Sequence, residues 1–265
     1  MEAMQRLLKI MAKLRDPDKG CPWDLRQTYS TIVPYTLEEA YEVADTIQRG
    51  EMSELRDELG DLLFQVVFYS QIAKEDGHFD FNDVSNGICS KMIRRHPHVF
   101  SDKQYQSDEE LRHAWEQTKA EERSQRNDIS AQTSHIDGVA KALPALIRAE
   151  KLQKWAARVG FDWPDAQSAF NKVREELEEV TSEMEGADKD RLQDELGDLL
   201  FSIVNVVRLL DLDAEQTMSR ANEKFEKRFR YMERRLNEEG ITNIQELSLE
   251  KLDNAWERMK RETKQ

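Results

Sequence analysis

The hydrophobic and polar positions of this chain follow a helical period. Over residues 4–14, for example, the apolar side chains are Met4, Leu7, Leu8, Met11 and Leu14. Apolar residues three and four positions apart are typical of a helix that buries one face. The stretches between such segments are short and contain Gly, Pro or Asp. The pattern therefore predicts an all-α protein.

The same reading predicts ten helices, over residues 4–14, 37–49, 53–73, 81–95, 107–123, 143–159, 167–184, 189–210, 214–239 and 249–261. Thr36 is expected to cap the second of them, with Glu39 three residues later as the partner in a capping box. Pro97 should end the helix over 81–95. Residues 124–137 have almost no apolar period and predict a linker between a domain over 1–123 and a domain over 138–265.

The second half of the chain repeats the first in the same order. Gly20 and Trp23 correspond to Gly160 and Trp163, and Ala-Trp-Glu at 114–116 corresponds to Ala-Trp-Glu at 255–257. The offset between equivalent positions drifts by only a few residues, so insertions and deletions fall in loops. We therefore expect a tandem duplication of one helical unit of about 120 residues, rather than a solenoid of short repeats.

Each repeat carries two clusters of acidic residues on consecutive predicted helices. The clusters are Glu175, Glu176, Glu179 with Glu195 and Asp198 in the second repeat, and Glu38, Glu39, Glu42 with Glu58 and Asp61 in the first. Residues three or four apart on a helix share one face. Residues 185–188 predict a turn, in which Gly186 ends one helix and Asp188 starts the next. A turn this short makes the two helices antiparallel neighbours. The carboxylates can therefore converge.

Converging carboxylates predict a metal site. Like charges at close range raise each other's pKa, so they cannot all stay ionised without a cation between them. Oxygen ligands with no local His or Cys suit Mg²⁺ or Mn²⁺ rather than Zn²⁺. A solvated acidic face is the alternative. Two features favour the metal: the acids lead directly into the apolar segments 62–69 and 199–207, and each repeat keeps a Gly at mid-helix, which costs up to about 1 kcal/mol relative to Ala.

Composition narrows the class of protein. The chain has 265 residues and a net charge of −14, which argues against nonspecific binding to nucleic acid or to an anionic membrane. No apolar run reaches the length of about 18 residues that a membrane span needs. The N-terminus lacks the apolar core of a secretion signal. Cys21 and Cys89 fit neither a disulfide framework nor a zinc spacing. We expect a soluble cytoplasmic protein.

A basic segment accompanies the acids of the second repeat. Residues 220–235 hold seven Arg or Lys against three Glu, with Lys224 and Arg228 four apart and Lys227 beside them. Carboxylates that bind a divalent cation, together with nearby Lys and Arg, predict a polyphosphate site. A solvated basic face is the alternative. Lys172 and Arg191 could also reach this site, or they could form ordinary ion pairs along their helices.

Trp256 lies on a polar predicted helix, between Asn254 and Glu257. An exposed aromatic ring can stack on a nucleobase. A ring packed over the neighbouring helix is the alternative, and the sequence does not separate the two.

Several motifs together resemble one known family. They are the two EExxE…ExxD pairs, GCPWD at 20–24, ELGDLLFQVVFY at 58–69, RRHPHVF at 94–100 and NEKFEKRFR at 222–230. In combination they closely resemble the MazG nucleoside triphosphate pyrophosphohydrolases, in the two-domain bacterial form, over essentially the whole chain. An EExxE pattern alone would not be specific.

The resemblance implies an all-α fold with four-helix-bundle packing completed by homodimerisation. It also implies Mg²⁺-dependent hydrolysis of nucleoside and deoxynucleoside triphosphates to the monophosphate and pyrophosphate, with loose base preference, in nucleotide-pool control or house-cleaning. Mn²⁺ would be a substitute metal. In this family the C-terminal unit is associated with activity, so the N-terminal unit is expected to be weak or inactive.

Carried over to this sequence, the resemblance assigns roles to individual residues. Lys224 and Arg228 would stabilise the leaving pyrophosphate, and Glu175 would orient the attacking water. The metal ligands would be Glu176, Glu179, Glu195 and Asp198. The nucleotide contacts would be Lys172, Glu175, Arg191, Lys224, Lys227, Arg228 and Trp256.

The N-terminal repeat keeps a second candidate site with equivalent residues. Its basic helix is cut short by Pro97, which predicts a weaker phosphate clamp, or a role in dimer or partner contacts. The residues of this site are Glu38, Glu39, Glu42, Glu58, Asp61, Lys91 and Arg95.

Two other functions remain open at this point. The chain could be a non-enzymatic dimeric scaffold or regulator with a protein partner, whose acids bind metal only structurally. It could also be a pyrophosphohydrolase restricted to another nucleotide, such as dUTP or a phosphoribosyl nucleotide.

Overall fold

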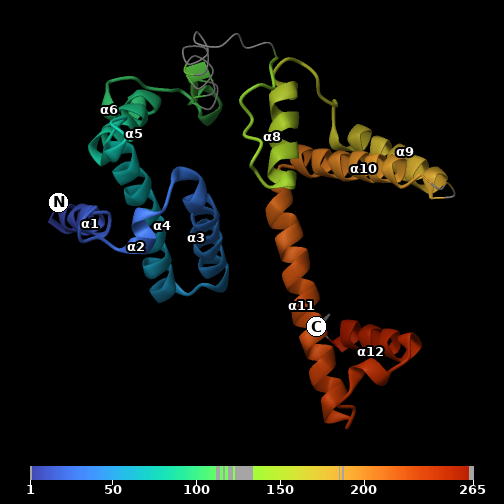
Figure 1. The fold of residues 1–265 in the computed structure, drawn as a ribbon. Helices are drawn as coiled ribbons and strands as arrows, with labels where there is room; N and C mark the ends of the chain where they lie inside the picture. The colour runs from blue at the N-terminus through green and yellow to red at the C-terminus, as the bar shows by residue number, and fades with distance from the viewer. Residues whose placement is uncertain are drawn as a thin grey trace. The chain divides into compact units, whose positions relative to one another are not determined.

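A computed structural model of the chain describes residues 2–111, 114–115, 117–118, 122, 134–184, 186 and 188–262. Every regular element among those residues is a helix (Figure 1). The chain divides into two compact units, residues 1–128 and 129–265. No helix in the described part of the chain combines the length and apolarity needed to cross a membrane. The predicted all-α class is confirmed.

The N-terminal unit is built on a hairpin of two long helices, α3 and α4, against which α1 packs. Its core consists of Met11, Ile32, Val67, Phe68 and Ile72, which are almost fully buried. The helices are α1 (Glu2–Leu14), α2 (Pro22–Leu25), α3 (Tyr29–Arg49), α4 (Met52–Glu75), α5 (Phe81–Arg95) and α6 (Pro97–Phe100). Helix α5 has the predicted bounds and ends before Pro97.

Helix α3 begins eight residues before the predicted start, so the prediction that Thr36 caps it was wrong. Thr28 is the cap, and its hydroxyl accepts a hydrogen bond from the Thr31 backbone N–H at 3.4 Å. The Thr36 hydroxyl instead donates to the Ile32 carbonyl at 3.1 Å, inside the helix. Pro34 is tolerated in the second turn, where its missing N–H removes a single helical bond. Glu39 therefore has no capping role and stays available for the site.

The C-terminal unit repeats this hairpin with α9 and α10, and α8 packs against α10 and α11. Asp188 caps α10, as the sequence predicted, by accepting from the backbone N–H groups of Asp190 and Arg191 at 3.0 and 3.3 Å. The elements are α8 (Ala145–Ala157), α9 (Ala166–Glu183), α10 (Lys189–Leu209), α11 (Ala214–Glu238), the 3₁₀ turn η1 (Ile244–Glu246) and α12 (Leu249–Glu262).

The long helix α11 connects two parts of the C-terminal unit. At its start, the Ala214 N–H donates to Glu150 of α8 at 3.5 Å. At its end, Met232 and Leu236 form a small core with Ala255 of α12. Figure 1 shows α12 folded against the part of α11 that lies away from α9 and α10. The middle of α11, over residues 216–227, is mostly exposed.

The order of the elements follows the predicted duplication. The α3–α4 hairpin of one unit corresponds to the α9–α10 hairpin of the other, and α5 corresponds to α11. The remaining predicted helices agree with the structure to within a few residues at each end. In the helix expected over 107–123, the described residues from Asp108 onward are helical, and the other residues lie outside the described part of the chain, as do residues 124–133 of the expected linker.

Candidate functional site

The α9–α10 hairpin brings three of the four predicted metal ligands together. Glu176 and Glu179 project from α9 and Glu195 from α10, and one carboxylate oxygen of each lies within 4.8 Å of the others. Glu176 is only 5% exposed. Burying a carboxylate beside two others costs free energy unless a cation compensates its charge. This cluster is therefore the main candidate for a cation site in the C-terminal unit.

The fourth predicted ligand, Asp198, is exposed on α10 one turn after Glu195 and stays outside this group. Its equivalent in the N-terminal unit, Asp61, does belong to the corresponding group. The hairpin positions both aspartates on the acid-bearing face. A ligand role for Asp198 remains a prediction.

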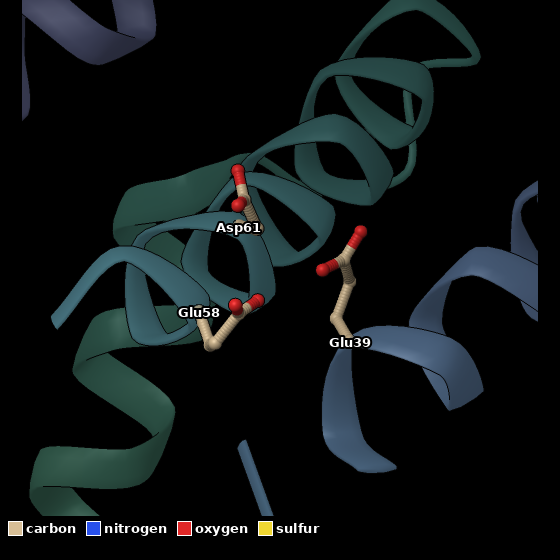
Figure 2. A group of neighbouring side chains, drawn as sticks. All are labelled: Glu39, Glu58 and Asp61. Atoms are coloured by element: carbon tan, nitrogen blue, oxygen red, sulfur yellow. The ribbon is translucent and has the colours of Figure 1, made fainter. Parts of the chain in front are cut away.

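The α3–α4 hairpin holds the second cluster. Figure 2 shows Glu39 on one helix and Glu58 and Asp61 on its neighbour, with the carboxylates of Glu39 and Glu58 turned toward the space between the helices. One oxygen of each lies within 4.8 Å of the others. Glu38 and Glu42, also predicted here, are outside this group, but their charges contribute to raising the pKa of Glu39. The hairpin therefore assembles three of the five acids predicted for this site.

The pKa is raised for Glu39 and Glu58 in one cluster and for Glu179 in the other. Burial raises the pKa of Glu39, and the charges of Asp61 and Glu42 raise it further. Burial and the charges of Glu42 and Asp61 likewise raise the pKa of Glu58. In the other unit, a hydrogen bond with Glu176 is the main cause that raises the pKa of Glu179. A bound cation would reverse all three effects.

Lys172 contacts the cluster of the C-terminal unit directly. Its Nζ lies 2.7 Å from Glu175 and 2.9 Å from Glu176. These carboxylates, Glu175 first, raise the pKa of Lys172 above its usual range. The ion pair along the helix, the alternative that the sequence left open, is therefore present, and it also neutralises part of the charge on a candidate metal ligand. Glu175 itself is exposed and lies outside the three-carboxylate group.

The other predicted cations do not contact the acids of the cluster in the described residues. Arg191 pairs with Glu183 at 2.5 Å, and Lys227 pairs with Glu223 at 3.2 Å. The Lys227 pair runs along its own helix, whereas Arg191 pairs across the turn with Glu183 of α9, so the pair within one helix that was the alternative for Arg191 is not what the structure shows. Lys224 is exposed and Arg228 half-buried on α11. Neither forms an ion pair within the part of the chain that the structure describes.

Trp256 is packed rather than free. Its ring lies 5.4 Å from that of Phe225, and it rests against the core of Met232, Leu236 and Ala255. The packing alternative is therefore present. The ring also lines a hollow of about 440 Å³ between α11, η1 and α12, whose walls are almost entirely apolar.

The basic residues of the N-terminal site have a partner that the sequence did not indicate. Glu122 accepts from Arg94 at 2.5 Å and from Arg95 at 2.6 Å. These hydrogen bonds, that from Arg95 above all, lower the pKa of Glu122 to about 2. The partner lies 27 residues from Arg95, beyond any helical spacing, so only the tertiary structure reveals it. Lys91 is half-buried on the same helix as the two arginines.

Comparison with known proteins places these hairpins in one family. A model of the MazG nucleotide pyrophosphohydrolase domain matches residues 27–100 and again residues 165–232. The chain is 50% identical to the nucleoside triphosphate pyrophosphohydrolase of Escherichia coli (strain K12), over 99% of this chain and 98% of that protein. It is 41% identical to the nucleoside triphosphate pyrophosphohydrolase/pyrophosphatase MazG of Thermotoga maritima, over 97% of this chain and 95% of that protein.

The raised pKa of Glu179 makes the stability of the metal-free protein depend on pH. The folded state binds more protons than the unfolded state between the ordinary glutamate pKa and the raised one, so stability falls as pH rises through that window. We expect Glu179→Gln to flatten this fall in thermal unfolding with a chelator present. Glu178→Gln, on the exposed side of the same helix, is the control. Identical pH profiles for the two variants would contradict the assignment.

Proposed function

We propose that this chain, which belongs to the MazG nucleotide pyrophosphohydrolase family, hydrolyses nucleoside triphosphates to the monophosphate and pyrophosphate. The observation that carries the proposal is the three-carboxylate group of the α9–α10 hairpin, which lies within the second region of family similarity. Ribo- and deoxyribonucleotides with different bases are expected substrates. The carboxylates of the site are suited to a metal ion and the Lys172 ammonium group to a phosphate. The triphosphate is common to all these substrates, whatever their base or sugar.

The cation of this site is proposed to be Mg²⁺, with Mn²⁺ as a substitute. Glu176, Glu179 and Glu195 would hold it, with Asp198 as a fourth ligand. A bound Mg²⁺ neutralises triphosphate oxygens and lowers the pKa of a coordinated water. The chain fixes the ligand positions: Glu176 is buried, and Lys172 holds one of its oxygens at 2.9 Å. Glu175 is the proposed group that orients the water attacking the α-phosphorus.

The phosphate charges are proposed to be met by the basic residues of the C-terminal unit. Lys224 and Arg228 would stabilise the charge that develops on the leaving pyrophosphate. Arg191 and Lys227 would first leave Glu183 and Glu223, and exposed ion pairs of this kind contribute only about 0.2–1 kcal/mol. This exchange therefore costs little. Trp256, on the wall of the apolar hollow, is the proposed contact for the nucleoside.

The C-terminal unit is proposed to be the catalytic one. Its clamp residues Lys224 and Arg228 have no acidic partner among the described residues. In the N-terminal unit, Arg94 and Arg95 are both held by Glu122. Both guanidinium groups donate to this one carboxylate, which compensates one of their two charges, and a phosphate would have to displace it to pair with both arginines. The N-terminal unit is therefore expected to turn over substrate weakly or not at all.

The acid-bearing hairpin also supports a homodimer. Large apolar side chains of α9 and α10 are exposed in the single chain, including Leu177 at 54% and Leu200 at 53%. Exposed apolar faces of this kind mark interaction surfaces. Two such hairpins can bury them in a four-helix bundle. We expect a molar mass in solution of twice the 31.1 kDa of the chain. A single-chain mass at micromolar concentration would contradict the dimer.

Product analysis tests the reaction. With Mg²⁺ and each of several NTPs and dNTPs, the protein should release the monophosphate and pyrophosphate. Glu179→Gln and Asp198→Asn should each reduce turnover on the order of 100-fold or more, because each removes a metal ligand. Circular dichroism should show an unchanged helical fold, and Glu178→Gln should retain activity.

Three results would contradict the proposed reaction. Release of diphosphate and phosphate would place the attack at a different phosphorus. Full activity in both Glu179→Gln and Asp198→Asn would show that the reaction does not depend on these proposed metal ligands. A stable, metal-independent dimer that releases no phosphate from any nucleotide would favour a scaffold or regulator, and activity confined to one nucleotide would favour the restricted pyrophosphohydrolase.

A further inference from the structure

The basic residues of α11 lie far along the helices from the acidic cluster that they are proposed to serve. Lys224 is ten residues past Ala214, where α11 begins, and Glu195 is fourteen residues before Leu209, where α10 ends. At 1.5 Å per residue, these positions are about 15 Å and about 21 Å from the turn between the two helices. They would be neighbours only if α11 folded back along α10.

Helix α11 does not fold back in this way. Figure 1 shows α11 leaving the end of α10 and running away from the α9–α10 hairpin, toward α12. Helix α9 packs along α10, whereas α11 packs mainly against α8 and α12. Among the described residues, the ion pairs of the α11 cations are with carboxylates of α11 itself or of α12. One chain therefore keeps its acidic cluster apart from Lys224 and Arg228.

The direction of α11 is fixed where the helix begins. Ala214 is 5% exposed, and its N–H donates to Glu150 of α8 at 3.5 Å. Asp213 caps the helix by accepting from the Gln216 N–H at 2.8 Å. No Pro or Gly occurs over residues 214–239, and sharp kinks occur almost always at Pro, at Gly/Ser pairs or where the hydrogen-bond ladder is interrupted. The helix is therefore a stiff arm that cannot return to the cluster of its own chain.

The surfaces of this arm and of the α9–α10 hairpin complement each other in charge and in polarity. Residues 220–235 of the arm hold seven Arg or Lys against three Glu, and Phe225, beside Lys224, is 56% exposed. The hairpin carries the three-carboxylate group and the exposed Leu177 and Leu200. Exposed apolar side chains beside charges of opposite sign are typical of two surfaces that bind each other. A second copy of the chain presents the hairpin that the arm cannot reach in its own chain.

We propose that each hydrolysis site is built from two chains. The three-carboxylate group of one chain would hold the metal, and Lys224 and Arg228 of the second chain would bind the phosphates. Trp256 packs on Phe225 of the same arm, so the nucleoside contact would also come from the second chain. In a dimer with twofold symmetry the exchange is mutual, and two arms complete two equivalent sites. This inference rests on the proposed reaction and adds that a single chain has no complete site.

Mixed dimers test the exchange. Two full chains with different affinity tags, one with Glu179→Gln and the other with Lys224→Met, are co-expressed and purified through both tags. Each variant alone should release little pyrophosphate from ATP with Mg²⁺, because both of its sites lack one component. The mixed dimer should recover about half of the wild-type rate, because one of its two sites combines an intact Glu179 with an intact Lys224. A mixed dimer as inactive as its parents would overturn the proposal.

The matched control places both substitutions in one chain and pairs that chain with the wild type. Under the exchange each site of this dimer lacks one component, so it should be inactive. If each chain used its own arm, the wild-type chain would keep a complete site, and about half of the wild-type rate would overturn the proposal. Circular dichroism checks the fold of every variant. Arg228→Met takes the place of Lys224→Met if the latter does not fold or keeps full activity.

A second measurement uses no turnover. Cys21 and Cys89 are first replaced by Ser to remove the native thiols. Chains with Glu195→Cys are then co-expressed with chains with Lys224→Cys, and the mixed dimer is treated with a short bismaleimide. A covalent product of two chains on a denaturing gel is expected, and no such product, or an equal yield from either variant alone, would overturn the exchange. If the cross-link forms while the wild type releases no pyrophosphate, the proposed reaction fails and the contact between arm and hairpin stands.

Discussion

The main physical constraint in this protein is the close approach of three carboxylates within each helix hairpin. They repel one another and lose solvation where the hairpin buries them, which raises the pKa values of Glu39, Glu58 and Glu179. Apolar packing on the same helices fixes the geometry, so the acids cannot move apart without disrupting the core. A positive charge between the carboxylates would therefore stabilise their ionised forms. A divalent cation can supply this charge and can also bind phosphate oxygens.

The chain contains such a three-carboxylate cluster in each of its two hairpins, and the residues around the two clusters differ. Lys172 partly neutralises the C-terminal cluster, which suits a site that takes up its metal together with a triphosphate. At the N-terminal cluster, the Gln65 amide nitrogen lies 3.5 Å from Glu39, and Glu122 accepts hydrogen bonds from both Arg94 and Arg95. The two hairpins therefore share one arrangement of carboxylates and differ in the charged groups around them.

Local patterns in the sequence were sufficient for most of the fold. Apolar period and turn residues located the helices and the two hairpins, and Asp188 marked the start of α10 correctly. The start of α3 was misplaced because Thr36 and Glu39 matched the pattern of a capping box, whereas Thr28 and Thr31 form the box and the buried Ile32 lies in the first turns of the helix. Acids three and four apart predicted the clusters for the same reason: helix geometry alone puts them on one face.

Contacts between distant segments could not be read in this way. Glu122 meets Arg95 through tertiary packing, and Gln65 approaches Glu39 only when the hairpin is closed. The packing of Trp256 on Phe225 likewise depends on how α12 folds against α11. The charged residues of the site could therefore be predicted from the sequence, but their ion-pair partners could not. These partners determine the net charge around each cluster.

The most direct measurement compares one substitution at equivalent positions of the two repeats. Glu176→Gln and Glu39→Gln remove the same carboxylate from the α9–α10 and α3–α4 hairpins, in otherwise identical full chains. Pyrophosphate release from ATP with Mg²⁺ should be lost in Glu176→Gln and largely retained in Glu39→Gln. Equal loss in both variants, or loss confined to Glu39→Gln, would contradict the assignment of the reaction to the C-terminal hairpin.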